Sequence, residues 1–219
     1  MSKILSTLIL ILLFINTSAQ DTVQSYSLII LKDCLILNKD STPFTGVAVQ
    51  ERIFSRKAKS IIKVQFGTKN GFHKDYYRNG QLKYEGFYNG GGQDGVQYEY
   101  YKNGNPSDIY EMSLSTYHGK SLCFSKKGKL TSIDNNIYGQ QTGSITYFRK
   151  RGTEKFELET LIESGKTKIK INANEDVSII GEHLNGKEHG TWKYYDKNGK
   201  CFSTTEYENG KKIYEKFID

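Results

Sequence analysis

Hydrophobic and polar residues alternate along most of the chain, with the period of a half-buried β-strand. In the stretch GVQYEYYKNG, residues 95–104, Val96, Tyr98 and Tyr100 fall on one side of such a strand and the intervening residues fall on the other. The stretch KTKIKINANEDVSII, residues 166–180, alternates in the same way. Glycine-containing turn signals separate such runs about every ten to fourteen residues, which is the spacing of successive hairpins. The pattern therefore predicts short antiparallel strands joined by tight turns.

The decapeptide GFHKDYYRNG, residues 71–80, is repeated along the chain. Related decapeptides begin at Gly95, Gly119, Gly143 and Gly190. The first four copies are 24 residues apart, and the last follows after 47 residues, close to two further units. Similarity at a fixed period is the signature of a repeat protein, in which each unit buries its apolar face against its neighbours.

Four positions of the decapeptide hold in all five copies. Glycine opens each copy, and a second glycine closes it: Gly80, Gly104, Gly128, Gly152 and Gly199. The sixth position is aromatic: Tyr76, Tyr100, Phe124, Phe148 and Tyr195. The eighth position is basic: Arg78, Lys102, Lys126, Lys150 and Lys197. Because these positions recur once per hairpin, we expect the rings to form a ladder across the sheet and the bases to form a stripe along its margin.

The turn sequences suggest a turn type. The closing glycine follows asparagine in three copies, as Asn79-Gly80, Asn103-Gly104 and Asn198-Gly199. Asn-Gly accepts positive φ at both central positions, so these pairs predict type I′ turns. Lys127-Gly128 and Arg151-Gly152 are poorer turn sequences and predict bulged or longer turns. Further Asn-Gly pairs lie at Asn70-Gly71, Asn89-Gly90, Asn185-Gly186 and Asn209-Gly210.

The predicted fold is all-β. We expect an elongated antiparallel meander of about seven hairpin repeats of 22–25 residues, forming one twisted sheet over residues 43–219. Residues 20–42 contain a strongly apolar strand, Leu28 to Leu37, which we expect to cap the first edge of the sheet, because uncapped edges aggregate. The tail KKIYEKFID, residues 211–219, is expected to cap the other edge.

The first 19 residues have the pattern of a cleavable signal peptide. Lys3 provides the positive charge, an apolar run follows from Ile4 to Ile15, and Thr17 to Ala19 form a small-residue cleavage site. The apolar run is short for a membrane span. We therefore predict export to the periplasm or beyond the cell surface of a bacterium.

Composition agrees with a strand-rich exported protein. The chain has 16 Tyr and 21 Gly but only 2 Pro, and its formal net charge is +7. The three cysteines, Cys34, Cys123 and Cys201, are an odd number, so at least one is unpaired. Their spacing matches no zinc motif.

The stretch LNGKEHGTWKYYDKNGK, residues 184–200, resembles the MORN-variant repeat of proteins labelled YwqK-type antitoxins. PFTG, residues 43–46, is similar to the phrase that precedes the first repeat in those arrays. The resemblance covers most of the mature chain, with drifted copies at Gly119 and Gly143. It implies an all-β array without known catalytic residues, and the antitoxin label implies neutralisation of a toxin by binding. Relatives of the repeat in other settings are associated with membranes and phospholipid.

Motifs for chemistry are few. The chain has no G-x-S-x-G nucleophile motif, and the glycine-rich GFYNGGGQDG, residues 86–95, lacks the Lys-Ser/Thr of a phosphate-binding loop. The stretch EHLNGKEHG, residues 182–190, contains two histidines and two glutamates across a turn, a set that could ligate a metal but that also fits an ordinary solvated turn. We predict no catalytic, metal or cofactor-binding residues and no enzyme activity.

We predict a non-enzymatic exported protein that binds a macromolecular partner, first of all another protein, through its sheet face. A second ring beside the repeated aromatic must face the opposite side of the strand, and exposed tyrosine is favoured at interfaces. The candidate partner-binding residues are Tyr77, Tyr101, Tyr194, Lys102 and Lys197. Two alternatives stay open: an antitoxin or immunity protein that neutralises a partner toxin, and an envelope protein that binds anionic lipid or glycan. Nucleic acid is not an expected partner of an exported chain.

Overall fold

The computed structural model describes nine ranges of the chain. They are residues 22–24, 28–30, 36–38, 40–52, 55–149, 152–153, 156–161, 166–171 and 176–218. The predicted signal peptide, residues 1–19, lies outside these ranges, as does Lys150. None of the described residues belongs to a helix long and apolar enough to cross a membrane.

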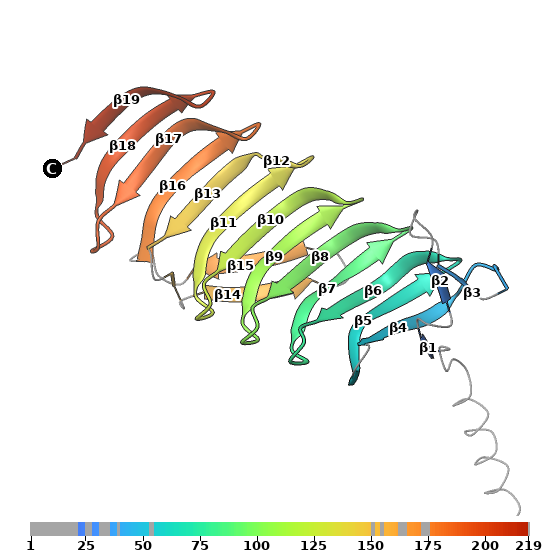
Figure 1. Ribbon diagram of the computed structural model, residues 1–219. Helices are drawn as coiled ribbons and strands as arrows, with labels where there is room; N and C mark the ends of the chain where they lie inside the picture. The colour runs from blue at the N-terminus through green and yellow to red at the C-terminus, as the bar shows by residue number, and fades with distance from the viewer. Residues whose placement is uncertain are drawn as a thin grey trace, which may run out of the picture.

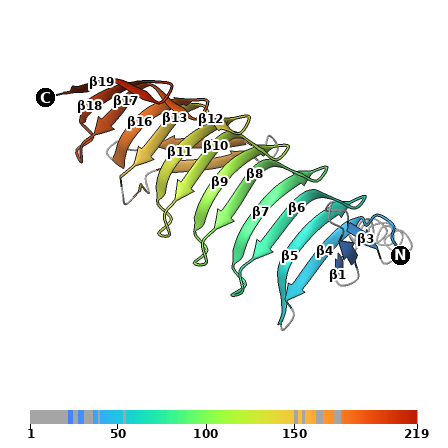
Figure 2. The same ribbon diagram turned by 45° about the horizontal axis from the view of Figure 1, so that its top comes forward.

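The protein is an elongated, twisted ribbon built around one sheet of 15 strands (Figures 1 and 2). The strands of this sheet are β1 (Thr22–Gln24), β4 (Gly46–Arg52), β5 (Ser55–Gln65), β6 (Thr68–Tyr76), β7 (Leu82–Asn89), β8 (Gly92–Tyr100), β9 (Pro106–Ser113), β10 (Thr116–Phe124), β11 (Leu130–Ile137), β12 (Gln140–Gln141), β13 (Gly143–Phe148), β16 (Val177–Leu184), β17 (Lys187–Tyr195), β18 (Cys201–Glu208) and β19 (Lys211–Phe217). From β4 onward, neighbours in the sheet are antiparallel and follow chain order, apart from β12, which pairs only with β11. The predicted all-β meander of hairpin repeats is confirmed.

The repeated decapeptide forms the first strand of each hairpin and the turn after it. Its aromatic sixth position is the last residue of β6, β8, β10, β13 and β17. Phe124 and Phe148 are buried in the largest apolar cluster, and Tyr195 packs against that cluster. The rings of Tyr98 and Tyr100 stack with centroids 6.4 Å apart. Three of the five copies thus bring their aromatic sixth position to one apolar cluster.

The interval of 47 residues between Gly143 and Gly190 does not hold two further units of the sheet. β13 pairs directly with β16, and between them β14 (Phe156–Leu161) and β15 (Lys166–Ile171) form a separate two-stranded sheet. The main-chain N–H of Arg149 donates to the carbonyl of Asp176 at 2.9 Å, so the two ends of this inserted hairpin meet at the sheet. β15 contacts β8 and β10, and the hairpin passes behind the sheet in Figure 1.

The first edge of the sheet is covered differently from the expectation. β1 pairs in parallel with Val47–Val49 of β4. β2 (Leu28–Ile30) and β3 (Ile36–Asn38), which fall in the apolar stretch expected to cap the sheet, instead pair with each other. An apolar hairpin can satisfy its own main-chain groups, so apolar character alone did not identify the strand that joins the edge.

The two margins of the ribbon carry different turns. After β6, β8, β10 and β17 five residues separate the two strands, with a bond such as Gly80 N–H to the Tyr77 carbonyl and positive φ at glycine alone. This is a type I turn followed by a left-handed glycine that forms a bulge. The prediction of type I′ turns at Asn79-Gly80, Asn103-Gly104 and Asn198-Gly199 was therefore wrong. We call this side the bulged-turn margin.

Turns of type I′ lie at the opposite margin. Both central residues have positive φ in Phe66-Gly67, Gly90-Gly91, Leu114-Ser115, Tyr138-Gly139, Asn185-Gly186 and Asn209-Gly210. From Gly90-Gly91 onward, the second residue of each turn donates its N–H to a carbonyl of the preceding hairpin, as Gly91 does to Lys69 at 2.9 Å and Gly210 does to Glu188 at 2.8 Å, and Gly67 donates to the Phe44 carbonyl. These bonds couple each hairpin to the one before it. Four Asn-Gly pairs lie outside the closing positions of the decapeptides. In Asn185-Gly186 and Asn209-Gly210 both residues are the central residues of a type I′ turn, whereas in Asn70-Gly71 and Asn89-Gly90 the asparagine does not have positive φ.

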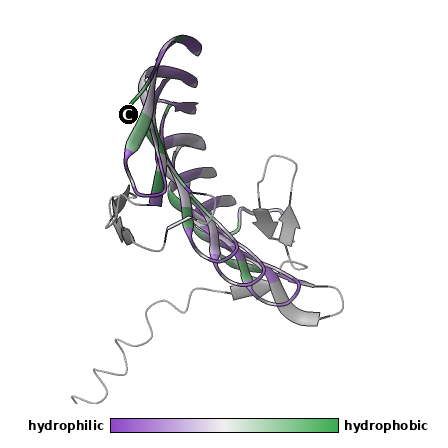
Figure 3. Ribbon diagram, turned by 90° about the vertical axis from the view of Figure 1, so that its left-hand side faces the viewer, coloured by the Kyte–Doolittle hydropathy of each residue, from purple (hydrophilic) through white to green (hydrophobic). Residues whose placement is uncertain are grey.

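The two faces of the sheet differ in chemistry. Register pairs Tyr98, Ile109, Leu122 and Ile133 in one row across β8–β11, and this face, the apolar face, contains the main buried cluster. The opposite face carries a row of mostly polar residues: Tyr84, Glu99, Asp108, Cys123, Ser132 and Tyr147. We call it the polar face. Figure 3 views the ribbon along its length and shows hydrophobic segments within strands and hydrophilic segments at the turns.

Candidate functional site

The bulged-turn margin is strongly basic. Its cationic side chains are Arg78, Lys102, Lys126, Lys127, Lys129, Arg149, Lys197 and Lys200. The one carboxylate in these described turns, Asp196, accepts bonds from the main-chain N–H groups of Asn198 and Lys200 within its own turn. In the four copies whose basic position the structure describes, that position lies along this margin, as the sequence predicted.

Tyr77 and Tyr101 lie in the bulged turns and tie neighbouring repeats together. The Tyr77 hydroxyl donates to the carbonyl of Tyr100 at 2.7 Å, and the Tyr101 hydroxyl donates to the carbonyl of Phe124 at 2.8 Å. Lys102 Nζ lies 6.0 Å from the centroid of the Tyr77 ring, within reach of a cation–π contact. These two rings therefore have a structural role in the array, whatever they bind.

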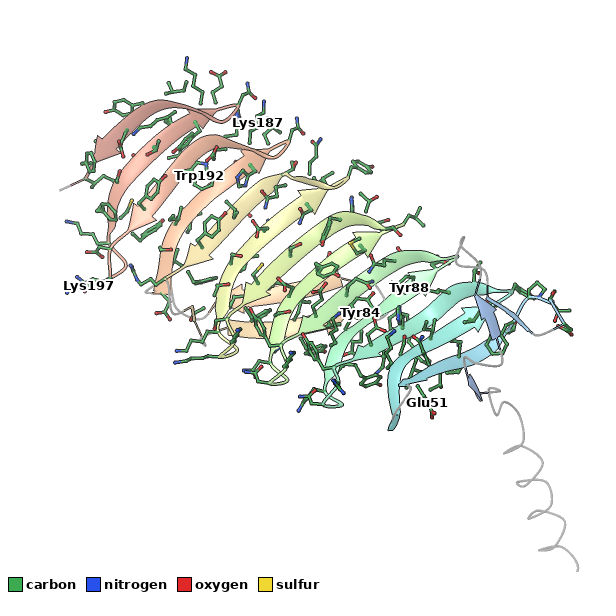
Figure 4. The ribbon with its side chains drawn as sticks, viewed as in Figure 1. Glu51, Tyr84, Tyr88, Lys187, Trp192 and Lys197 are labelled. Atoms are coloured by element: carbon green, nitrogen blue, oxygen red, sulfur yellow. The ribbon has the colours of Figure 1, made fainter. Side chains whose placement is uncertain are left out.

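The five predicted partner-binding residues do not form one surface. Tyr194 pairs with Ile179 and Ser203 one residue before the end of β17, on the polar face, whereas the other four residues lie in the bulged turns. Lys197 lies in the bulged turn that follows β17, and Figure 4 shows it at the margin opposite Lys187. The sequence analysis grouped Tyr194 with Tyr77 and Tyr101. Tyr77 and Tyr101 are the seventh residues of their decapeptides, whereas Tyr194 is the fifth residue of its decapeptide. Their role in binding stays a prediction.

Charge is segregated on the polar face. Within the strands β7–β11, β13 and β16–β18 the lysines are Lys83, Lys120, Lys187 and Lys193, and all have the phase of the apolar face. Carboxylates of the polar face are Glu99, Asp108, Asp134 and Glu188. Glu99 and Asp108 lie directly opposite each other in the register, an arrangement that like charges disfavour. In these strands the polar face therefore carries no lysine or arginine, although the net charge of the whole chain is +7.

Tyrosines accompany the carboxylates. The polar face carries Tyr84, Tyr88, Tyr110, Tyr117, Tyr147, Tyr194 and Tyr207. Tyr110 donates to Glu99 Oε1 at 3.0 Å, and its ring lies 5.1 Å from that of Tyr117. Burial, and then the charge and hydrogen bond of Glu99, raise the pKa of Tyr110. Tyr117 remains 43% exposed, so the face presents both rings and carboxylates to solvent.

A buried polar cluster lies at the start of this face. Tyr84 donates to Gln97 Oε1, and Gln93 Nε2 donates to the Tyr84 hydroxyl at 3.0 Å. The Gln97 amide lies fully buried and donates to the carbonyls of Phe87, Asp94 and Gly95. Figure 4 shows Tyr84 and Tyr88 close together on β7.

His73 connects this cluster to the strands before it. Its ring lies 5.5 Å from Tyr84 and 5.4 Å from Tyr88, and its Nε2 is 3.1 Å from Ser60 Oγ and 3.2 Å from Asp75 Oδ1. Burial alone would raise the pKa of Asp75, but hydrogen bonds with His73 and Ser60 outweigh it and hold that pKa below its ordinary value.

Ser60, His73 and Asp75 do not form a catalytic relay. A serine–histidine–carboxylate relay uses one ring nitrogen for the hydroxyl and the other for the carboxylate. Here both partners contact Nε2, and Nδ1 is buried without a hydrogen-bond partner among the described residues. The sequence analysis did not single out this trio, because its members come from two strands with no motif between them.

Cys123 also lies on the polar face. Cys123 and Cys201 are free thiols in the described part of the chain, and Cys34 is outside it. Burial raises the pKa of Cys123 to about 11, with a hydrogen bond from Ser132 acting in the opposite direction and Asp108 adding to the rise. Its thiolate is therefore scarce at neutral pH.

The histidine and glutamate side chains around Asn185-Gly186 are divided between the faces. Glu182 pairs with His189 and His183 pairs with Glu188, and successive residues of a strand point to opposite faces. Among the described residues no group of three or more histidine, cysteine, aspartate or glutamate side chains is placed to hold a metal ion.

Two glycines without a turn role were missed by the sequence analysis. Gly181 faces the ring of Trp192, and a Cβ at this position would overlap that ring. Gly86 has the same relation to the side chain of Gln97 and the Tyr84 hydroxyl. In both cases the glycine lets a large side chain of the next strand lie flat over it. The sequence feature that could have identified them is a glycine in the middle of a strand, which often marks a place where another group approaches the main chain closely.

The MORN repeat variant matches this chain at residues 69–89, 93–110 and 188–209. These segments cover β6–β7, most of β8–β9 and β17–β18. The chain carries MORN repeat variant units at these three places. Each match spans one hairpin of the sheet and its bulged turn. No curated protein matches the chain.

Proposed function

We propose that the protein binds a macromolecular partner through the polar face, without catalysing a reaction. The observation that supports this most is the segregation of charge: carboxylates and tyrosines lie on one face, and every lysine of strands β7–β11, β13 and β16–β18 has the phase of the other. Tyrosine is enriched at protein interfaces, and complementary charge guides association and orientation. The partner proposed is therefore a protein with a positively charged surface.

A site-specific photo-crosslinker tests which face is used. Placed at Tyr117 on the polar face, it should capture the same partner that the wild-type chain retains from an envelope extract. Placed at Phe87, which is exposed and has the phase of the apolar face, it should capture much less. Equal capture from both positions would contradict binding through the polar face.

Charge reversal gives the matched test. Glu99→Lys should weaken binding of the captured partner at least tenfold, since it places a repulsive charge among the rings. Glu208→Lys makes the same change in net charge at an exposed position beside Asn209-Gly210, outside the polar face, and should leave binding within about twofold. Turnover of a substrate by the purified protein would count against a purely binding role.

The partner could be narrowed to a toxin through the resemblance to YwqK-type antitoxins. An exported antitoxin would act outside the inner membrane, as an immunity protein. Deletion of the gene should then sensitise the cell to a toxin encoded beside it, and the toxin should co-purify with the wild-type chain but not with Glu99→Lys. If the deletion strain grows normally with that toxin present, the antitoxin hypothesis is wrong, but the proposal that the protein binds a partner through the polar face is unaffected.

The basic bulged-turn margin favours a second candidate, the binding of an anionic lipid or glycan. Interactions of exposed cations with such ligands fall steeply with salt. Lys102→Glu with Lys197→Glu should abolish binding to vesicles containing anionic lipid or to an acidic polysaccharide at low salt. Glu99→Lys should not reduce that binding, so the two candidates are distinguished by the same pair of variants.

A further inference from the structure

Large apolar side chains project from three of the type I′ turns. Phe66, Leu114 and Tyr138 are the first central residues of their turns, at multiples of the 24-residue repeat, and are 73%, 72% and 82% exposed. Their φ values are 49°, 46° and 50°, a region that bulky side chains seldom adopt. Strained positions of this kind cluster at functional sites. We call these three residues the apolar tips.

The same turn position holds residues suited to it in the other type I′ turns. It is Gly90 in the turn between β7 and β8, and Asn185 and Asn209 in the two turns nearest the C-terminus. Glycine and asparagine accept this conformation at little cost. Formation of the turn therefore does not require an apolar residue.

Charge divides this margin in the same way. The four turns that contain the apolar tips and Gly90 carry no charged residue; they are residues 65–68, 89–92, 113–116 and 137–140. Lys187 and Lys211 directly follow the two Asn-Gly turns, and Glu208 precedes the second. The apolar tips thus lie in an uncharged part of the margin, which can be removed from water without burying a charge.

The type I′ turns lie in one row along the ribbon (Figures 1 and 2). Main-chain bonds from each turn to the preceding hairpin, such as Ser115 N–H to the Gln93 carbonyl at 2.8 Å, hold the spacing of this row. Two strands separate successive turns, so the spacing is about 10 Å. Between Phe66 and Leu114 the row has a gap at Gly90-Gly91, where an added Cβ would meet no atom within 4 Å.

This order of tips and gap is complementary to itself in the antiparallel sense. When two copies meet margin to margin about a two-fold axis between the second and third turns, Phe66 of each copy faces Tyr138 of the other. Leu114 of each copy then faces the gap at Gly90-Gly91. A parallel arrangement would set each tip against its own equivalent and leave the two gaps facing each other. The gap therefore favours a second copy as occupant, since the copy supplies a projection that fills it.

We propose that the apolar tips bind the same four turns of a second copy of this chain, so that two ribbons pair side by side and antiparallel. This pairing leaves the polar face and the bulged-turn margin open, so it is compatible with a partner on either. Burial of two aromatic rings and a leucine removes roughly 500 Å² per copy from water, against about 800 Å² per partner in stable complexes. The dimer is therefore weak and forms as concentration rises.

Substitution of the tips by asparagine tests the pairing without unfolding the chain, because asparagine suits this turn position. We expect the wild-type chain to sediment as a concentration-dependent dimer. Phe66→Asn, Leu114→Asn and Tyr138→Asn should each weaken dimerisation about fivefold or more, since each removes buried apolar area, with unchanged or higher thermal stability. Phe202→Ser is the control. It removes a side chain that is 43% exposed near the start of β18 and should leave dimerisation within about twofold.

Filling the gap separates this pairing from general apolar adhesion. Gly90→Asn keeps a residue suited to the turn but adds a side chain where Leu114 of the other copy would lie. It should weaken dimerisation as much as Leu114→Asn does, although it removes no apolar surface. A dimer that both substitutions leave intact overturns the proposal, as does a wild-type chain that is a monomer at every concentration.

Crosslinking between copies tests the antiparallel arrangement. In chains whose three native cysteines are replaced by serine, a Phe66→Cys chain mixed with a Tyr138→Cys chain should be joined by a short bismaleimide. Either chain alone should be joined far less, because three turns separate these positions along one copy, about 30 Å. Equal crosslinking in all three samples contradicts the arrangement. A monomer that instead binds vesicles of neutral lipid through the apolar tips overturns the choice of a second copy as occupant.

Discussion

The Tyr77 hydroxyl donates a hydrogen bond of 2.7 Å to the main-chain carbonyl of Tyr100, 23 residues further along the chain. Tyr101 makes the same bond to Phe124. In the fourth copy Arg149 occupies the equivalent position, and its Nη2 lies 3.3 Å from the carbonyl of Tyr195, on the far side of the inserted hairpin. In these three copies the side chain at this position thus bridges the bulged turn to the end of the next repeat's first strand in the sheet.

Removal of these bridges should weaken the array. A hydrogen bond of this kind contributes about 1 kcal/mol to the free energy of unfolding, so Tyr77→Phe and Tyr101→Phe should each lower stability by about that amount, measured by urea unfolding. Tyr138→Phe is the control, because that ring is 82% exposed in its turn. Should the two variants match the control, the bridges would have no energetic role.

Gly181 should not tolerate a side chain. A Cβ there would overlap the Trp192 ring, which is buried and donates through Nε1 to the carbonyl of Glu182 at 3.2 Å. Gly181→Ala should therefore cost about 1–3 kcal/mol of stability, the range for overpacking a buried site. Thermal or urea unfolding measures the loss.

A double-mutant cycle separates the overlap from an effect on the main chain. In a chain that already carries Trp192→Leu, Gly181→Ala should cost much less, because the ring that it overlaps is gone. An equal cost in both backgrounds would mean that the strand itself, and not the ring, excludes the alanine.

Sequence periodicity predicted the strands and the aromatic column because both depend on local alternation. Tyr100 and Phe124 end their strands at the same position of the repeat, and the phase of Val96 and Tyr98 placed them on the apolar face. Turn type was not predictable in the same way. Asn-Gly occurs at both margins, and the number of residues between strands decides whether it forms a two-residue turn or the end of a bulged one.

The interactions that cross between repeats were beyond the sequence analysis. The Tyr77 bridge depends on where a turn lies relative to a carbonyl one hairpin away, and the inserted hairpin leaves the sheet at a position where the 47-residue spacing alone suggested further units. Charge segregation could have been found. Alternate residues of each predicted strand can be assigned to the two faces. Glu99 and Asp108 then fall on one face and Lys120 and Lys193 on the other, which shows the segregation of charge.

Turn strain at Leu114 offers a stabilising substitution. Leu114 has φ of 46° and is 72% exposed, although the left-handed region costs an ordinary residue about 1–2 kcal/mol. Asparagine tolerates this conformation. Leu114→Asn should therefore raise the free energy of unfolding by about 1 kcal/mol, with a higher melting temperature.

Leu114→Ala is the matched control for this substitution. It removes the same exposed apolar side chain but keeps an ordinary residue in the left-handed region, so it should leave stability close to that of wild type. If alanine stabilised as much as asparagine, loss of exposed apolar surface and not relief of the main chain would be the cause.

Cys123 should be an unreactive thiol whose reactivity depends on folding. Burial raises its pKa from the ordinary value of 9.0 to about 11, and the thiolate is the form that alkylates. In a Cys34→Ser, Cys201→Ser chain, iodoacetamide should react slowly near neutral pH, with a rate that rises as pH approaches 11. Unfolding in urea should move that rise down toward pH 9.

The same shift sets the direction of a stability change. The folded chain holds its proton to higher pH than the unfolded chain does, so stability is unaffected below pH 9 and declines as pH rises from 9 toward 11. Cys123→Ser should remove that part of the decline. Asp108→Asn should lower the thiol pKa, because Asp108 contributes to the rise through its hydrogen bond and charge. A thiol that alkylates equally fast in the folded and unfolded chain would contradict its burial on the polar face.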